Sequence, residues 1–145
     1  MYNALSSKVA FDNLEDSLSG TLSVYPVAAD AVVATSDGSA WDRTGAWAEV
    51  VPALTITHDI WLEALVIETT SNVDTFLLDV GTGGVGGETV VASARTTITH
   101  VANTNSVSSP IRKKISANTR IAVRSTCKTA AALTASVSIS YRAVA

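Results

Sequence analysis

The chain has 145 residues, of which 47% are hydrophobic and 16% are charged, and its formal net charge is −3. These proportions exclude a disordered chain and allow one domain with a core of its own. The sequence also contains no apolar run that approaches the roughly 18–20 residues of a membrane helix, so no membrane partner is expected.

The N-terminal residues and the cysteine content indicate the cellular compartment in which such a chain is expected. Residues 1–10 lack the basic start and the apolar core of a signal peptide, so none is expected. The single Cys127 cannot form an internal disulfide, and we expect a small buried thiol in a reduced or redox-indifferent setting.

Charge is unevenly distributed along the chain. All thirteen acidic residues lie between Asp12 and Glu88, and eight of the ten basic residues lie from Arg95 to Arg142, so the first 90 residues carry −11 and the last 55 carry +8. Such halves can neutralise each other inside one sheet or across a subunit contact. Nucleic-acid binding is not expected, because Tyr141 is the only aromatic residue of the basic half available for stacking on bases.

Residues 1–40 are predicted to form an N-terminal arm. Leu14 and Leu18 share a helical spacing, and Thr21–Val24 and Ala31–Thr35 are predicted short strands. Ordering each residue costs about 1–2 kcal/mol, and this segment has too little apolar mass to offset that cost alone. We therefore expect the arm to lie along a neighbouring subunit or along the domain's own flank, with a frayed terminus as the alternative.

The turn Ser36–Ser39 leads into the predicted domain of residues 41–145, which begins with two tryptophans. Exposed rings of Trp41 and Trp47 would stack on a sugar, whereas core or subunit-contact rings are the more common arrangement and are favoured here. The strand that follows is expected to end at Pro52.

Residues 59–92 carry the strongest strand pattern. Two apolar runs rich in Val, Ile and Leu are separated by a turn at Asn72 and predict two central strands. Five glycines follow within residues 81–87 and include a literal G-x-G-x-x-G. A dinucleotide site is not predicted, because β-branched residues replace the required helix and no acidic residue follows Glu88. No Lys-Ser or Lys-Thr follows the glycines, so a P-loop is excluded too. No cofactor is expected, and the glycines are interpreted as a strand connection.

Short strands are predicted for the rest of the chain, with a polar loop over residues 102–109 and a turn over residues 116–119. The predicted strands cover Gly87–Ala92, Arg95–Val101, Ile111–Ile115, Arg120–Ser125 and Ala135–Arg142. The third would be an edge strand protected by lysines. In the fourth, Ile121 and Val123 should point inward and both arginines outward. Eight or nine strands without strong helical patterns indicate an all-β sandwich.

Catalytic and metal-binding patterns are weak. His58 and His100 have no second ligand at metal spacing, so a surface or capping role is expected for each. Ser125–Lys128 matches S-x-x-K but lies in or beside a predicted strand, without the companion motifs. The acid pairs Glu63/Glu68 and Asp74/Asp79 have an odd spacing that places their members on opposite strand faces. The chain is therefore predicted not to be an enzyme, with no catalytic, cofactor-binding or metal residues.

Several segments resemble jelly-roll proteins of tailed-bacteriophage virions. They are Ile60–Glu63, Phe76–Gly83, Gly87–Ala92 and Pro110–Arg124, within a likeness that spans residues 41–145. The last of them is similar to an I-P-A-G-T-R-I-A-x-R turn and strand. Here Ser116 replaces the proline and Asn118 the glycine, and asparagine tolerates the left-handed backbone that the turn needs.

This resemblance implies a jelly-roll β-sandwich and no catalytic residues. It implies a capsid decoration or cement protein that binds and stabilises the shell of the major capsid protein as an oligomer, with a trimer favoured. Its expected location is the capsid surface of the virion, which is assembled in the cytoplasm of the bacterial host. A carbohydrate- or receptor-binding jelly-roll module of a phage tail or fibre is the alternative, with Trp41 and Trp47 as its candidate stacking residues.

Overall fold

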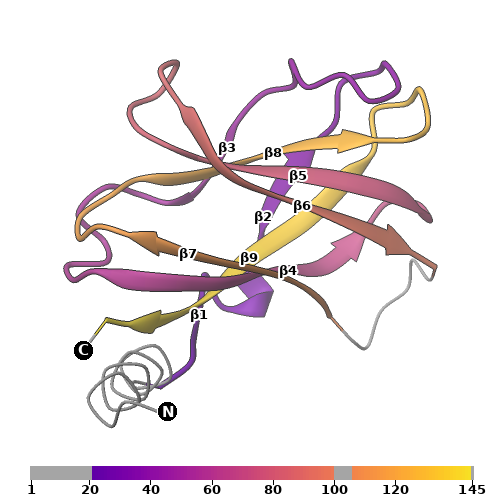
Figure 1. Ribbon diagram of the computed structural model, residues 1–145. Coiled ribbons are helices and arrows are strands. Elements are labelled where there is room, and N and C mark those ends of the chain that lie inside the picture. Colours follow the sequence, from indigo (N-terminus) through magenta and orange to yellow (C-terminus); the bar gives the residue numbers. More distant parts are fainter. Residues whose placement is uncertain (1–20, 100–105, 145) are drawn as a thin grey trace, which may run out of the picture.

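Two antiparallel sheets face each other in the computed structural model of the chain, which describes residues 21–99 and 106–144 (Figure 1). Sheet A contains β1 (Ser23–Tyr25), β2 (Val32–Thr35), β4 (Ile60–Thr70), β7 (Val107–Ile115) and β9 (Thr134–Ala143). Sheet B contains β3 (Ala48–Val51), β5 (Asp74–Thr82), β6 (Thr89–Ile98) and β8 (Ile121–Cys127). The predicted all-β sandwich is confirmed.

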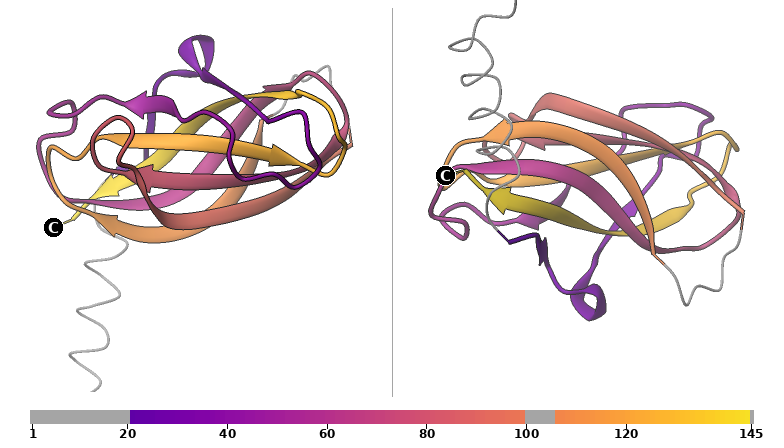
Figure 2. Two further views of the ribbon diagram at one scale, coloured as in Figure 1. Left: turned by 90° about the horizontal axis from the view of Figure 1, so that it is seen from above. Right: turned by 60° about the horizontal axis from the view of Figure 1, so that its bottom comes forward.

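The strands alternate between the layers. Sheet A has the order β1-β9-β4-β7 with β2 also paired to β9, and sheet B has the order β3-β8-β5-β6. From β2 onward, every connection except the β5–β6 hairpin crosses from one sheet to the other. The layered arrangement is visible from two further directions in Figure 2.

The core lies between the sheets because alternate side chains of the central strands point inward. On β5, Phe76, Leu78 and Val80 are fully buried, and β4 and β9 contribute branched residues such as Leu65 and Ile139. The predicted inward position of Ala135, Val137 and Ile139 on β9 is confirmed, and so is that of Ile121 and Val123 on β8. Ser138 and Ser140 of β9 are buried as well, although they belong to the other face. The predicted turns hold as well: residues 71–73 separate β4 from β5, and Asn118 adopts a φ of 63° between β7 and β8.

The strand predictions for β6 and β7 were partly wrong. Residues 89–98 form one strand rather than two, because a register shift near Val91 lets a single chain follow β5 from Thr82 to Asp74. Strand β7 begins at Val107, so part of the predicted polar loop belongs to it. Pro110 fits inside this strand because β7 is an edge strand, where its missing N–H is not needed for pairing. Residues 100–105, including the rest of that loop, lie outside the described residues.

Part of the predicted arm belongs to sheet A. β1 pairs with residues 139–141 of β9 and β2 pairs with residues 134–137, with the short 3-10 turn η1 (Ala28–Asp30) between them. Ala34 of β2 is almost fully buried in the core. The sandwich therefore extends upstream of the boundary drawn at residue 41, and this part of the arm lies along the domain's own flank. Residues 1–20 lie outside the described residues.

Candidate interaction surface

The two outer faces of the sandwich differ in chemistry, and the outer face of sheet B carries a charged network. Arg124, Asp79 and Ser93 form a row across neighbouring strands β8, β5 and β6. Arg124 donates to the Asp79 carboxylate over 2.9 Å and Ser93 over 2.6 Å. Arg43, from the segment between β2 and β3, donates to both carboxylate oxygens, over 3.0 Å from its Nε atom. The Asp79 side chain is only 1% exposed, so these donors replace the water it loses.

This network shifts the pKa of its members. Burial alone would raise the pKa of Asp79, but hydrogen bonds from Arg43, Ser93 and Arg124 outweigh burial, and the pKa lies below its usual value. The same contact with Asp79 raises the pKa of Arg43. Asp79 therefore remains a carboxylate at neutral pH, and it acts as an anchor rather than a proton donor.

Trp41 and Trp47, the two candidate residues for stacking on a sugar, both contact arginines on this face. The guanidinium of Arg124 lies 4.6 Å from the Trp47 ring centroid, and Arg95 lies 4.9 Å from that of Trp41. The edge of the Trp47 ring lies so close to Gly81 that a Cβ atom there would be 2.7 Å away. A sugar could reach the arginine-covered face of either ring only by displacing that arginine.

The segment between β2 and β3 is fastened over sheet B by further contacts. The Trp41 amide donates to the carbonyl of Cys127 over 2.9 Å, and the Thr126 hydroxyl donates to the carbonyl of Asp42 over 2.9 Å. Seen from above, this segment runs over the strands of sheet B (Figure 2). Much of this outer face is therefore occupied by the chain itself.

A second cluster holds the glycine-rich connection between β5 and β6. Arg120 donates to Glu49 over 2.6 Å, to Glu88 over 2.9 Å and to the carbonyl of Gly83 over 3.2 Å. Gly83 and Gly86 adopt φ values of 114° and 79°, which side chains disfavour. The glycines thus form a tight strand connection, as predicted from the sequence.

The opposite charges of the two chain halves meet inside the domain. Arg120 and Arg124 pair with acids of the first 90 residues, and Glu63 lies 3.4 Å from Arg112 and 3.8 Å from Arg142. Of the two alternatives that the sequence left open, neutralisation inside the sheets is therefore observed.

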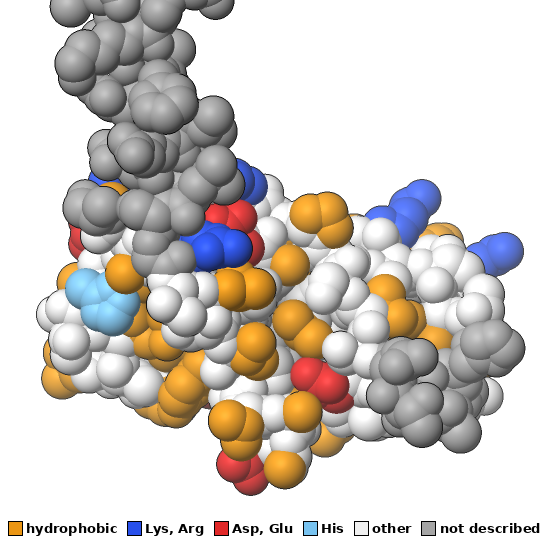
Figure 3. Space-filling model, turned by 90° about the horizontal axis from the view of Figure 1, so that it is seen from below, with side chains coloured by type: hydrophobic (Ala, Val, Ile, Leu, Met, Phe, Trp, Pro, Cys, Tyr) orange, Lys and Arg blue, Asp and Glu red, His pale blue; other side chains and the backbone are white. Residues whose placement is uncertain are grey.

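The outer face of sheet A is different, because its central positions are uncharged. From the pairing register, Val24, Val33 and Val66 share this face with the serines of β9. We call it the uncharged face and define it by these residues: Val24, Val33, Ala64, Val66, Ser136, Ser138 and Ser140. Val24 and Val33 are exposed, whereas Ala64, Val66, Ser138 and Ser140 are at most 8% exposed. Figure 3 shows this side of the molecule, where hydrophobic side chains lie among white atoms, with a few acidic side chains between them.

Exposed apolar side chains concentrate beside this face. Leu22, Val24, Val27 and Val33 are 44–60% exposed and all belong to the edge formed by β1, η1 and β2. An exposed apolar surface with few charges is typical of a protein–protein contact. The uncharged face together with this edge is therefore the candidate interaction surface.

The weak catalytic patterns of the sequence do not assemble into a site among the described residues. His58 is exposed in the connection before β4, and no group of three or more His, Cys, Asp or Glu residues in the described ranges could hold a metal. His100 lies outside those ranges. Ser125 is buried on the inner face of β8, which confirms that its S-x-x-K match lies in a strand.

The acid pairs are also separated or occupied. Asp74, the first residue of β5, accepts hydrogen bonds from the amides of Thr75 and Thr129 and takes no part in the Asp79 network. Glu63 and Glu68 both lie at register shifts of β4, so the face assignment counted along the sequence does not apply to them.

Cys127 is a buried free thiol, as predicted. Its sulfur lies 3.2 Å from the Ser36 hydroxyl, which donates to the carbonyl of Ala131 over 3.0 Å. These contacts connect the end of β2 to the β8–β9 connection.

No protein-family model, curated protein or solved structure matches this chain. Within residues 21–99 and 106–144, the structure contains no helix long and apolar enough to cross a membrane.

Proposed function

We propose that the chain is a structural component of a tailed-bacteriophage virion, a decoration or cement protein that binds the shell of the major capsid protein. The observation that carries the proposal is the contrast between the faces. Much of one face of the sandwich is covered by its own chain. The other face has uncharged middle positions that are largely buried, beside an edge where Val24 and Val33 are exposed. Such a surface suits contact with another protein.

The strand order supports the jelly-roll part of the proposal. Counting β2 to β9 as eight strands, sheet A has the order first, eighth, third, sixth, and sheet B has the order second, seventh, fourth, fifth. A double-sheet jelly roll built from two Greek keys has this arrangement, and viral capsid domains use it.

The proposed action is mechanical. The sandwich buries its own core, so it is a preformed body that loses little conformational entropy on docking. The uncharged face and its edge contact coat subunits, and the N-terminal arm and the loops bridge to a neighbour. An oligomer, with a trimer favoured, repeats these contacts on the capsid surface. The proposed place of assembly is the bacterial host cytoplasm.

Particle labelling tests this proposal. An antibody raised against the purified chain should label the heads of tailed-phage particles from the source strain, and light scattering of the purified chain should give an oligomeric mass. Particles that remain unlabelled, in a lysate that contains the protein in free form, would refute it.

A receptor- or carbohydrate-binding module of a tail or fibre is the second candidate, because the Trp41 side chain is 38% exposed. In that case the antibody would label the tails of the particles instead of the heads. Glycan-array binding would then be expected, and Trp41→Ala would abolish it.

A further inference from the structure

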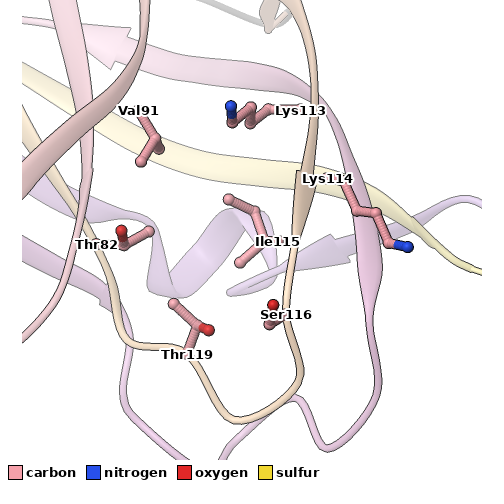
Figure 4. Close-up of a pocket in the computed structure, with 7 residues that line it drawn as sticks. All are labelled: Thr82, Val91, Lys113, Lys114, Ile115, Ser116 and Thr119. Atoms are coloured by element: carbon pink, nitrogen blue, oxygen red, sulfur yellow. The ribbon is translucent and has the colours of Figure 1, made fainter.

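A hollow of about 180 Å³ lies at one end of the sandwich, where the ends of β5, β6 and β7 meet the turn between β7 and β8 (Figure 4). Thr82 and Val91 come from sheet B, and Lys113, Lys114 and Ile115 come from sheet A. Ser116 and Thr119 of the turn complete the lining. The register shift near Val91 lies beside this hollow.

Polar groups that can donate hydrogen bonds line this hollow. Thr82, Ser116 and Thr119 each contribute a hydroxyl, and Lys113 contributes an ammonium group, whereas no lining residue is acidic. Among the described residues, none of these four side-chain groups has a hydrogen-bond or ion-pair partner. Buried Ile115 and half-buried Val91 provide the apolar part of the lining.

The two lysines have different orientations although they are adjacent. Lys113 is paired opposite Leu62, whose side chain points into the sandwich, and Lys114 is opposite Trp61, on the outer face. Figure 4 shows Lys113 extending toward Val91, across the hollow, and Lys114 pointing away from it. The Lys113 ammonium group therefore shares the hollow with three hydroxyls, and the lining contains no carboxylate.

We propose that this hollow binds a small oxyanion, either a free inorganic anion or the carboxylate of an acidic side chain on a partner protein. Lys113 supplies the charge, and the hydroxyls of Thr82, Ser116 and Thr119 donate hydrogen bonds to the anion's oxygens. An inward-pointing lysine that only protects the edge strand β7 from pairing is the competing explanation. This proposal is independent of the virion function.

The adjacent lysines provide a matched pair of variants, because Lys113→Gln and Lys114→Gln remove the same charge from the same strand. The full chain, labelled with ¹⁵N, is titrated with sodium sulfate and, separately, with sodium acetate at constant ionic strength. The wild type and Lys114→Gln should show saturable shifts of the Thr82, Ser116 and Thr119 amide signals. Lys113→Gln should weaken the affinity about tenfold, as expected for the loss of one charge-assisted hydrogen bond.

The two anions distinguish the sources: saturation by acetate alone identifies a carboxylate ligand, and saturation by sulfate identifies a free tetrahedral anion. Ser116→Ala, which changes no charge, should weaken anion binding as well. It replaces Lys113→Gln as the test variant if Lys113→Gln does not fold. Linear shifts with both anions, or equal weakening in Lys113→Gln and Lys114→Gln, would overturn the proposal and leave edge protection as the role of Lys113.

Discussion

Asp79 places a carboxylate in the middle of a central strand, between the fully buried side chains of Leu78 and Val80. A charge in that position is tolerated only with partners, and Arg43, Arg124 and Ser93 supply them. Because Arg43 comes from the segment between β2 and β3, this one residue also holds that segment on sheet B.

Replacing Asp79 by asparagine should therefore destabilise the domain. Removing one member of a buried pair costs about 3–5 kcal/mol, and here we expect about 2–3 kcal/mol because Arg43 stays half exposed and keeps its hydration. Urea unfolding at pH 7 measures the difference. Asp30→Asn, which changes an exposed acid, is the control and should alter the free energy of unfolding by less than about 0.5 kcal/mol.

The same residue predicts how stability depends on pH. The pKa of Asp79 is lower in the folded state, so the unfolded chain takes up its proton first as the pH falls. The contribution of Asp79 to the free energy of unfolding is complete above its pKa in the unfolded chain, about 3.9. This contribution is lost as the pH falls through its pKa in the folded state. The stability gap between wild type and Asp79→Asn should accordingly be constant from pH 7 to pH 5 and close below about pH 4. A gap that is unchanged at acid pH would contradict this assignment.

Gly81 is required for packing rather than for backbone freedom. A Cβ atom at this position would lie 2.7 Å from the Trp47 ring, whereas at Gly84 it would meet nothing within 4 Å. Gly81→Ala should cost about 1–3 kcal/mol through overpacking. Thermal unfolding of Gly81→Ala and Gly84→Ala compares the two positions, and equal stabilities would show that the Trp47 contact is not a constraint.

At the scale of elements, β1 and β2, which both pair with β9 at one edge of sheet A, decide how much of the N-terminus can be removed. Deleting residues 1–20 removes no described strand, whereas deleting residues 1–38 also removes β1, β2 and the buried Ala34. The shorter deletion should fold and keep its β-sheet circular dichroism. The longer one should unfold or aggregate, because it exposes the edge of β9. A stable, monomeric product of the longer deletion would show that β1 and β2 are dispensable.

Strands with regular alternation were predictable from the sequence, and strands with local irregularities were not. Alternating residues identified β9 and the inward residues of β8, and Asn72 marked the turn after β4. The register shift near Val91 was invisible, so β6 was divided in two. Pro110 was treated as the end of a loop, because a sequence does not say which strand will be an edge.

The charged network was predictable only in part. The outward position of Arg120 and Arg124 followed from alternation, but their nearly complete enclosure did not. A lone Asp79 among apolar residues already demands a buried partner, and that demand could have indicated the network. Its partner Arg43 is 36 positions away in a segment without regular structure, so no periodicity connects the two.

At the scale of the whole molecule, the distribution of ionic groups explains the contrast between the faces. Much of the ionic pairing is used on and around the outer face of sheet B, where it fastens the chain to itself. On sheet A, the ion pairs of Glu63 with Arg112 and Arg142 lie beside the uncharged face, and the edge of that face carries exposed valines. Docking through the exposed valines of this edge would bury apolar surface, which stabilises the contact by about 25 cal/mol per Å², without the cost of desolvating charges.

The most direct test introduces one charge into this surface. Val33 and Val73 are both 54% exposed, but only Val33 lies on the uncharged face. Purified wild-type, Val33→Asp and Val73→Asp chains are added to phage particles produced without the gene for this chain, and co-sedimentation is measured. We expect Val33→Asp to lose binding while Val73→Asp binds like the wild type. Undiminished binding of folded Val33→Asp would contradict the assignment of this face to the capsid shell.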